Sequence, residues 1–353
     1  MASGTRHAED AAARLRLRAG MPASGEAVRH LSVLSDLESA GGSGDPIELA
    51  GVDLCVDQWH LVQAGRMALD LVFTPPLGKD NFIKVTGGDG SALVRNDLPR
   101  SRIEEPVLFL GGTRNYYHWM LDTLPRLAAI GHLDHSLPIL VNAQPAAFQL
   151  RTLERLGIEP ERLMVPDAPV LTRFDKLTVP QLGARKRRAD GQVDWMVPSA
   201  TAEAARWVRD RLSSEADGTT PRRILVSREG ALFRRCENEA AIRAVAARRG
   251  FTAVRLEELS FNEQAALFSG AEVVLGVHGA GFTNMLFAPP GALLIELHPA
   301  GHLPEFYRHL TGLLGQHHHA VPGTITQALY PALEYNWNFR VDPADVDLYL
   351  AAL

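Results

Sequence analysis

Hydrophobic and polar residues alternate in a regular order along the second half of the chain. Short apolar runs predict strands at Arg223–Val226, Thr252–Leu256, Glu272–Val277, Leu293–Leu297 and Gln316–Val321. The periodicity between them predicts helices at Asn238–Arg249, Asn262–Ser269, Thr283–Phe287 and Pro304–Leu314. This strict alternation is typical of half of a doubly wound fold, in which ligands bind at the carboxyl ends of the strands.

The first half is less regular. Apolar runs predict strands at Val107–Leu110, Pro138–Val141 and Lys176–Val179, and helices at 115–130 and Pro145–Leu156, the first of them bent at Pro125. Residues 50–105 indicate small strands whose pairing the pattern does not specify. The alternation after residue 105 suggests a largely parallel sheet covered by helices.

A length of 353 residues predicts two domains. A breaker-rich segment at 183–192 places the boundary near 195, within about fifteen residues. We therefore expect a weakly ordered lead-in over residues 1–45, an N-terminal α/β domain over 46–195 and a Rossmann-like domain over 196–330. The last segment, 331–353, carries a helix at Pro343–Leu353 that we expect to pack back on the first domain.

Composition narrows the class of protein. A hydrophobic content of 46% and a charged content of 22% suit a soluble globular chain, and a net charge of −5 argues against nucleic-acid binding through a basic surface. Two cysteines without CxxC spacing indicate a reducing compartment. The chain has no apolar run of the ~18 residues that a membrane span needs and no secretory signal. We expect a cytoplasmic protein, with peripheral attachment at the inner membrane left open.

A polar stripe lies on the predicted helix NYYHWMLDTLPRL, residues 115–127. At 100° per residue, Asn115, His118, Asp122 and Arg126 fall on one side and the apolar residues on the other. The i,i+4 spacing lets Asp122 contact His118, and a carboxylate beside an imidazole is the arrangement of a general base. The alternative is a solvated helix face with weak intrahelical ion pairs.

Two further segments follow predicted strands of the second half. In VSREGALFRRCENE, residues 226–239, arginines cluster before a helix start, where phosphate oxygens bind; a charged loop is the alternative. In LGVHGAGFTNMLFAPPG, residues 275–291, small residues let the backbone approach a ligand, although Asn284 replaces the third glycine of a dinucleotide fingerprint. Glu296 ends the next strand, where it would bind ribose hydroxyls or lie in solvent.

Two other patterns are of types that bind metal ions elsewhere, but their predicted positions argue against a metal site here. Asp345-Val346-Asp347 lies in the terminal helix, away from any strand end, and a strand sends His318 to the face opposite His317 and His319. We expect no catalytic metal.

These segments resemble glycosyltransferase family 61, over roughly residues 105–300 and without gaps from 224 to 297. The length and lead-in are similar to the bacterial branch, the capsular polysaccharide biosynthesis proteins. The resemblance implies a GT-B architecture, two Rossmann-like domains with parallel sheets facing a central cleft. It also implies inverting, metal-independent transfer from a nucleotide-sugar, typically UDP-linked, to a glycan or lipid-linked saccharide, with no cofactor besides the donor and with polysaccharide-assembly partners left open.

The resemblance also assigns residues by motif. The base is Asp122 or His118, and the choice between them stays open. The residues assigned to the donor phosphates are Arg228, Arg234, Arg235, Asn238, His278, Gly279, Ala280, Gly281 and Asn284. The nucleoside is assigned to Glu258 and Glu296, and the acceptor side to Asn115, Trp119 and Arg126.

Two other classes of function remain open. A non-catalytic module that binds nucleotide-sugars or glycans would keep the arginines and the glycine loop but would not turn over. A pyruvyl or phosphoryl transferase on a similar fold would use another donor. Hydrolysis screened across a panel of sugar nucleotides separates the three.

Overall fold

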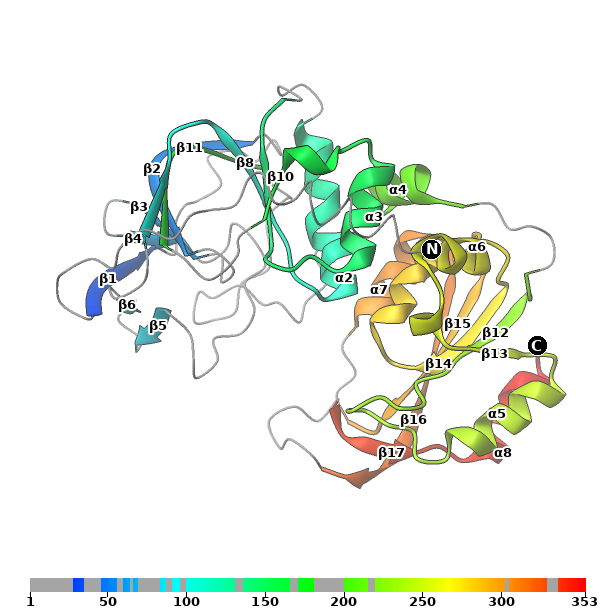
Figure 1. Cartoon of the computed structure of the whole chain (residues 1–353). Coiled ribbons are helices and arrows are strands. Elements are labelled where there is room, and N and C mark those ends of the chain that lie inside the picture. Colours follow the sequence, from blue (N-terminus) through cyan, green and yellow to red (C-terminus); the bar gives the residue numbers. More distant parts are fainter. Residues whose placement is uncertain are drawn as a thin grey trace. The chain divides into compact units, whose positions relative to one another are not determined.

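A computed structural model describes most of the chain. The described residues are 28–34, 46–55, 60–63, 66–68, 83–86, 91–95, 100–130, 136–165, 171–180, 200–214, 220–301, 305–328 and 336–353. They form two compact units, Met1–Trp195 and Met196–Leu353, which we describe separately (Figure 1). The expected lead-in lies outside the described residues apart from Val28–Leu34, which form a strand, and so does the breaker-rich segment at 183–192.

The first unit is built on one mixed sheet. Its strands follow the order β10-β9-β8-β11-β2-β3-β4-β1-β6-β5, with β7 beside β11. Their bounds are β1 Val28–Leu34, β2 Ile47–Cys55, β3 His60–Gln63, β4 Arg66–Ala68, β5 Ile83–Thr86, β6 Ser91–Arg95, β7 Arg100–Ile103, β8 Val107–Gly111, β9 Ile139–Val141, β10 Leu163–Met164 and β11 Leu171–Val179.

The strands after residue 105 have the parallel pairing that the sequence suggested, and the pairs β7–β11 and β1–β4 are also parallel. Strands β10, β9, β8 and β11 are parallel neighbours, whereas β11–β2, β2–β3 and β3–β4 are antiparallel. Only a few residues separate β2 from β3 and β3 from β4, which is enough for a hairpin but too little for a parallel crossover. The unit is therefore a mixed α/β structure rather than a wholly parallel domain.

The helical segment after β8 changes its geometry twice. It begins as α2, Tyr116–His118, continues as a π-helical turn over Trp119–Thr123 and ends as a 3-10 helix over Leu124–Ile130. Pro125 has no N–H to donate, and the preceding Leu124 N–H bonds back to the Trp119 carbonyl, five residues earlier. The remaining helical elements of this unit are α3, Ala147–Arg155, and a short 3-10 turn at Pro160–Arg162.

The second unit has the predicted alternation. Its sheet has the order β13-β12-β14-β15-β16-β17, and the first five strands are parallel. The strands are β12 Arg223–Val226, β13 Thr252–Val254, β14 Val273–Val277, β15 Leu293–Pro299, β16 His317–Gln327 and β17 Asn338–Arg340. The helices are α4 Ala202–Leu212, α5 Glu239–Arg248, α6 Phe261–Ser269, α7 Phe306–Leu313 and α8 Pro343–Ala351, with 3-10 helices at Leu256–Glu258 and Ala280–Leu286.

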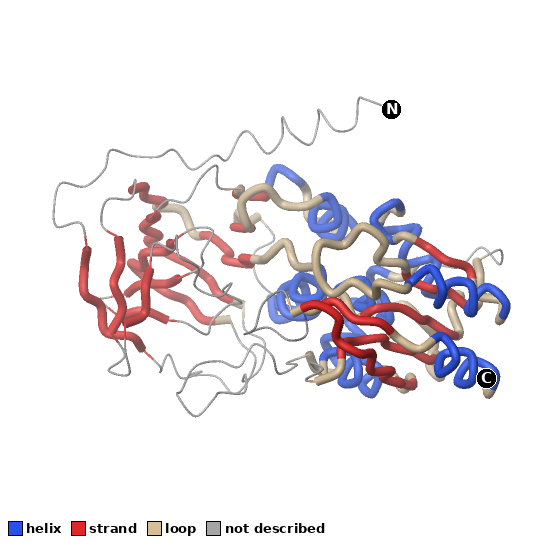
Figure 2. The backbone as a smooth tube through the Cα atoms, turned by 90° about the horizontal axis from the view of Figure 1, so that it is seen from below, coloured by secondary structure: helices blue, strands red, loops and turns tan. Residues whose placement is uncertain are grey.

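Helices cover both faces of this sheet. Figure 1 shows α5 and α8 on one face and α6 and α7 on the other, and Figure 2 shows the strands of this unit with helices packed around them. Gly250 ends α5 in the left-handed conformation, with φ of 78°, as predicted for a C-terminal glycine. The order of the strands reverses between β12 and β14, because the chain runs outward to β13 before it returns to β14. In doubly wound folds ligands bind at this reversal, at the carboxyl ends of the two strands.

The C-terminal segment differs from the expectation. It belongs to the second unit, where β17, which the sequence did not predict, pairs antiparallel with β16 and α8 packs on α5. Val346 and Leu350 of α8 are buried in the core of this unit, and Arg249 Nε lies 2.9 Å from Asp347 Oδ1. The apolar side of a short terminal helix does not specify which core it joins, and α5 supplies the complementary surface.

Candidate functional site

The carboxyl ends of β12 and β14 bring the arginine loop and the glycine loop together. Arg228 follows β12 by two residues, and Gly279 follows β14 by two. The Nη1 of Arg228 occupies the space that a side chain at position 279 would fill, so the guanidinium lies directly against the backbone of the glycine loop. The two segments that the sequence singled out therefore form one site at the reversal of the strand order.

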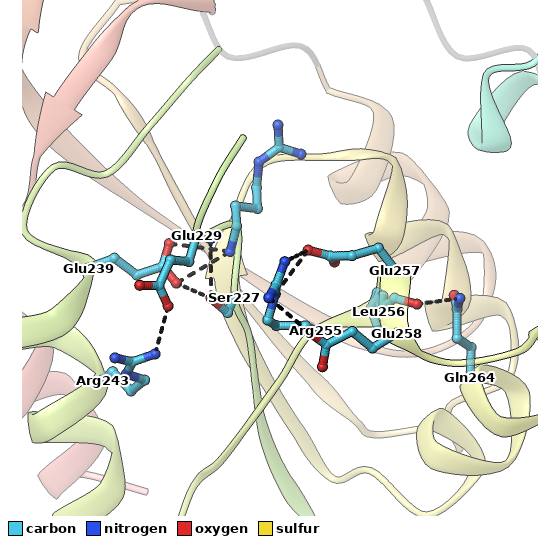
Figure 3. A network of polar contacts seen from close by, with 10 residues as sticks. Ser227, Glu229, Glu239, Arg243, Arg255, Leu256, Glu257, Glu258 and Gln264 are labelled. Atoms are coloured by element: carbon cyan, nitrogen blue, oxygen red, sulfur yellow. Dashed lines mark hydrogen bonds and ion pairs between the residues drawn. The ribbon is translucent and has the colours of Figure 1, made fainter. Parts of the chain in front are cut away.

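A hydrogen-bonded carboxylate shapes the start of the arginine loop. Ser227 Oγ donates to Glu239 in the first turn of α5 (Figure 3). The Arg228 backbone N–H lies 3.2 and 3.3 Å from the two carboxylate oxygens of Glu239. Nearby, Arg243 pairs with Glu229 at 3.1 Å. Sequence analysis missed Ser227 and Glu239, although an acidic residue in the first turn of a helix after a strand is a recognisable signal.

Arg228 has the surroundings of an anion-binding group. Its Nη2 donates to the Phe233 carbonyl at 3.4 Å, and its buried Nε has no hydrogen-bond partner among the described residues. Burial lowers the pKa of this guanidinium, while more distant acidic groups oppose the shift. A buried guanidinium without a carboxylate against it is costly unless an anion binds to it.

The two neighbouring arginines are arranged differently. Arg234 adopts a left-handed backbone conformation, with φ of 56°, and donates to the His278 carbonyl at 2.7 Å and to Asn336 Oδ1 at 2.8 Å. It therefore connects the arginine loop to the glycine loop and to the segment before β17. The side chain of Arg235 is exposed, while its backbone N–H donates to Asn338.

His278 and Glu296 form a buried pair. His278 Nδ1 donates to Glu296 Oε1, and His318 Nε2 lies 2.6 Å from Glu296 Oε2. Glu296 is 0% exposed, so it does not lie in solvent, and both of its oxygens accept hydrogen bonds from histidines rather than being open to ribose hydroxyls. Burial lowers the pKa of His278, and hydrogen bonds from both histidines overcome the effect of burial and lower the pKa of Glu296.

Other residues assigned to the donor take structural roles. The side chain of Asn238 exchanges two hydrogen bonds with the Val341 backbone, at 2.7 and 3.2 Å, and so ties α5 to the segment after β17. Asn284 is fully buried and donates to Gln264 Oε1 at 2.9 Å. Asn284 is therefore buried away from solvent, whereas Asn238 is half-buried with its side chain engaged by the Val341 backbone.

The rest of the glycine loop and Glu258 lie at the same edge of the sheet. Ala280 begins the 3-10 helix that follows β14, and a side chain at Gly281 would meet Leu256 Cδ1 at 2.7 Å. Glu258 follows β13, remains exposed and pairs with Arg255 at 2.8 Å (Figure 3). The structure thus leaves Glu258 accessible at the edge where the sequence placed it.

In the first unit, the histidine and the aspartate of the stripe are in contact. His118 Nδ1 lies 2.6 Å from Asp122 Oδ2, and the side chains are 13% and 3% exposed, respectively. The more accessible imidazole is therefore held by a buried carboxylate, rather than lying with it on a solvated helix face. Asn115 is the N-cap of α2, and its Oδ1 accepts from the His118 N–H at 3.3 Å.

Trp119 and Arg126 belong to the interior of the unit rather than to a surface for an acceptor. Trp119 is 0% exposed, donates from Nε1 to Thr152 Oγ1 at 2.9 Å and lies under Gly112. Arg126 is 3% exposed and donates to the carbonyls of Pro180, Leu110 and Phe109. Its guanidinium therefore ties the end of β8 to the end of β11.

Among the residues that the structure describes, no group of three or more His, Cys, Asp or Glu side chains is arranged to hold a metal ion. Asp347 of the terminal DxD pattern pairs with Arg249 instead. Within the same described ranges, none of the helices has the length and hydropathy to cross a bilayer.

One protein family matches the part of the chain that carries the His118–Asp122 contact, the arginine loop and the glycine loop. The model of the Glycosyltransferase 61 family matches residues 116–295. The chain is 30% identical over 207 residues to beta-1,2-xylosyltransferase XAX1 of Oryza sativa subsp. japonica, covering 55% of this chain and 36% of that protein. It is 39% identical over 77 residues to protein O-linked-mannose beta-1,4-N-acetylglucosaminyltransferase 2 of Takifugu rubripes, covering 21% of this chain and 13% of that protein.

A third similar protein is the EGF domain-specific O-linked N-acetylglucosamine transferase of Drosophila melanogaster, 37% identical over 62 residues, which cover 18% of this chain and 12% of that protein. The chain thus spans about a third or less of the length of these relatives.

Proposed function

The chain belongs to the glycosyltransferase 61 family, and we propose that it transfers a sugar from a nucleotide-sugar donor to a hydroxyl group of a glycan acceptor. We further propose a UDP-linked donor, inversion at the anomeric carbon and a polysaccharide or lipid-linked saccharide as acceptor. The similar proteins are named as transferases of xylose and N-acetylglucosamine, which supports glycosyl transfer as the reaction class.

The observation that carries this proposal is the half-buried Arg228, whose buried Nε has no hydrogen-bond partner among the described residues and whose guanidinium lies against Gly279 at the reversal of the strand order. When the bond between the sugar and the diphosphate breaks, negative charge builds up on the leaving phosphate. A fixed guanidinium and backbone N–H groups of the glycine loop stabilise that charge without a metal ion. Removing one such donor typically lowers kcat by ~10²–10³.

The proton of the attacking hydroxyl needs an acceptor, and His118 is the better candidate in the first unit. Its ring is more accessible than the carboxyl of Asp122, and its Nδ1 is hydrogen-bonded to that carboxyl. We therefore propose that His118 is the base and that Asp122 orients the ring and stabilises the imidazolium.

Calorimetry and hydrolysis with a panel of UDP-, GDP- and CDP-sugars test the proposal. We expect binding and slow hydrolysis with one or more UDP-sugars. Arg228→Lys weakens binding, while Arg308→Lys, an exposed arginine paired with Glu305, leaves it unchanged. Asp122→Asn abolishes transfer and keeps UDP affinity.

Three outcomes would contradict the proposal. Binding of a sugar nucleotide without turnover under any acceptor condition would indicate a binding module. Turnover of a donor that is not a sugar nucleotide would indicate a pyruvyl or phosphoryl transferase. Transfer at the wild-type rate in Asp122→Asn would place the base elsewhere.

A further inference from the structure

The register of three parallel strands places His278, Glu296 and His318 on one face of the second sheet. Glu296 of β15 lies opposite Gly276 of β14 and Ala320 of β16. His278 is two residues beyond Gly276, and His318 is two residues before Ala320, so both imidazoles project to the same side as Glu296. The small side chains directly opposite Glu296 leave space for both diagonal contacts.

The hydrogen bonds fix the protonation pattern of this cluster. Glu296 accepts from His278 Nδ1 through one oxygen and from His318 Nε2 through the other. A carboxylate without exposure is stabilised in its ionised form only when both oxygens have donors. His318 therefore keeps Glu296 ionised, and Glu296 keeps the proton of His278 on Nδ1.

The remaining nitrogen of His278, Nε2, has no hydrogen-bond partner among the described residues. The charged and titratable groups that face this imidazole are Glu296 from β15, Arg228 and Arg234 from the arginine loop, and Tyr307 from α7, whose ring centre lies 5.2 Å from that of His278. Burial lowers the pKa of His278, Glu296 opposes this shift, and the two arginines add to it. The net shift favours the neutral ring, with a lone pair on Nε2.

A neutral Nε2 and a phosphate oxygen are both acceptors and cannot form a hydrogen bond with each other. The negative charge of an incoming diphosphate also offsets the positive charges of Arg228 and Arg234. Because these charges lower the pKa of His278, the diphosphate raises that pKa and favours the protonated ring. We propose that His278 takes up a proton at Nε2 when a nucleoside diphosphate binds and donates that hydrogen bond to the departing phosphate, with Glu296 and His318 as its positioning residues.

This inference rests on the proposed function, and it specifies where protons go. The proton of the acceptor hydroxyl goes to His118, the bond between the anomeric carbon and the phosphate oxygen breaks, and the new carbon–oxygen bond forms. The leaving oxygen keeps the electron pair of the broken bond and accepts the hydrogen bond from His278. The proton on His278 comes from solvent during binding.

Titration calorimetry of the full chain with UDP, at pH 7.5 in buffers of different ionisation enthalpy, tests the proposal. At this pH UDP itself is almost fully ionised, because its second phosphate pKa is about 6. We expect uptake of about half to one proton per UDP bound. His278→Gln should bind UDP more weakly and take up none, and His317→Gln, at an exposed position of β16 next to His318, should behave as the wild type.

Two variants of His318 test whether this residue positions His278 through Glu296 or only contributes to the stability of the fold. His318→Gln retains an N–H group for Glu296 and should keep the proton uptake. His318→Phe leaves a buried oxygen of Glu296 without a donor, so the carboxyl group holds a proton before UDP arrives and the uptake is lost. Equal uptake by both variants would remove His318 from the proposal.

The inference and the proposed function fail in different ways. Binding of UDP by the wild type without proton uptake, or with the same uptake in His278→Gln, would overturn the role of His278 and leave glycosyl transfer intact. Absence of UDP binding at any concentration would instead contradict the proposed UDP-linked donor on which the inference rests.

Discussion

Replacement of Arg126 by lysine tests whether this residue holds the first sheet together or contacts an acceptor. The guanidinium donates to the carbonyls of Pro180 at 2.8 Å, Leu110 at 2.7 Å and Phe109 at 3.4 Å. A lysine ammonium is a compact group that lacks the several N–H donors spread over a planar guanidinium, so it can donate to roughly one of these carbonyls. The variant therefore leaves at least one buried acceptor without its charged donor.

The expected cost follows from these contacts. A hydrogen bond to a charged group contributes about 1.5–3 kcal/mol, so Arg126→Lys should lower the free energy of unfolding of the first unit by about 3 kcal/mol. This corresponds to a roughly hundredfold larger equilibrium constant for the opening of the first unit.

Amide hydrogen exchange measured by mass spectrometry reports that change locally. Peptides covering Val107–Gly111 and Leu171–Val179 should lose about a hundredfold in protection, while peptides covering β14 and β15 keep theirs. The control Arg151→Lys, at an exposed position paired with Glu154, should change protection little. Unchanged protection together with a raised KM for the acceptor would refute the structural role of Arg126. Such a result would instead support its assignment to the acceptor side.

Two further predictions follow from the second unit. In Gly279→Ala the new methyl group displaces the Arg228 guanidinium, so UDP affinity should fall at least tenfold by calorimetry; Gly312→Ala, where the space is open and the residue lies in α7, should leave it unchanged. The hydrogen bond from Arg249 lowers the pKa of Asp347 below its ordinary 3.8, so this pair stabilises α8 above that pH and the contribution is lost as the pH falls through the lowered value. The protection factors of the amides in Pro343–Ala351, which compare each exchange rate with the intrinsic rate at the same pH, should therefore fall towards pH 3 in the wild type, and Asp347→Asn should show the same reduction already at pH 7; equal protection of α8 in both proteins at pH 7 would contradict this role of the pair.

The strands and helices of the second unit could be predicted from periodicity because each buried strand is a short apolar run between turn residues. Strand β12 has the predicted bounds, and the other predicted strands and helices differ mainly at their ends. The helix predicted at Thr283–Phe287 is instead a 3-10 helix over Ala280–Leu286. Strand β17 was missed, because three residues after a meandering segment carry no alternating pattern.

The stripe on the first polar helix was predicted in part. The contact between His118 and Asp122 follows from the i,i+4 spacing and is present. The π-helical turn over Trp119–Thr123 changes the rotation per residue, so Arg126 no longer continues the stripe and points into the sheet. A calculation at 100° per residue cannot anticipate this, because the change comes from Pro125 and from the packing of Trp119.

By itself, the sequence determined which residue types follow which strands: an arginine after β12, a histidine and glycine after β14, and a carboxylate in β15. These follow from local periodicity and turn chemistry, which need no knowledge of distant contacts. Only the tertiary structure decided that Glu296 lies between two histidines, that Asn238 and Asn284 are interior contacts, and that the last helix joins the second unit. Strand register and burial decide such partnerships, and both arise from contacts between residues far apart in the chain.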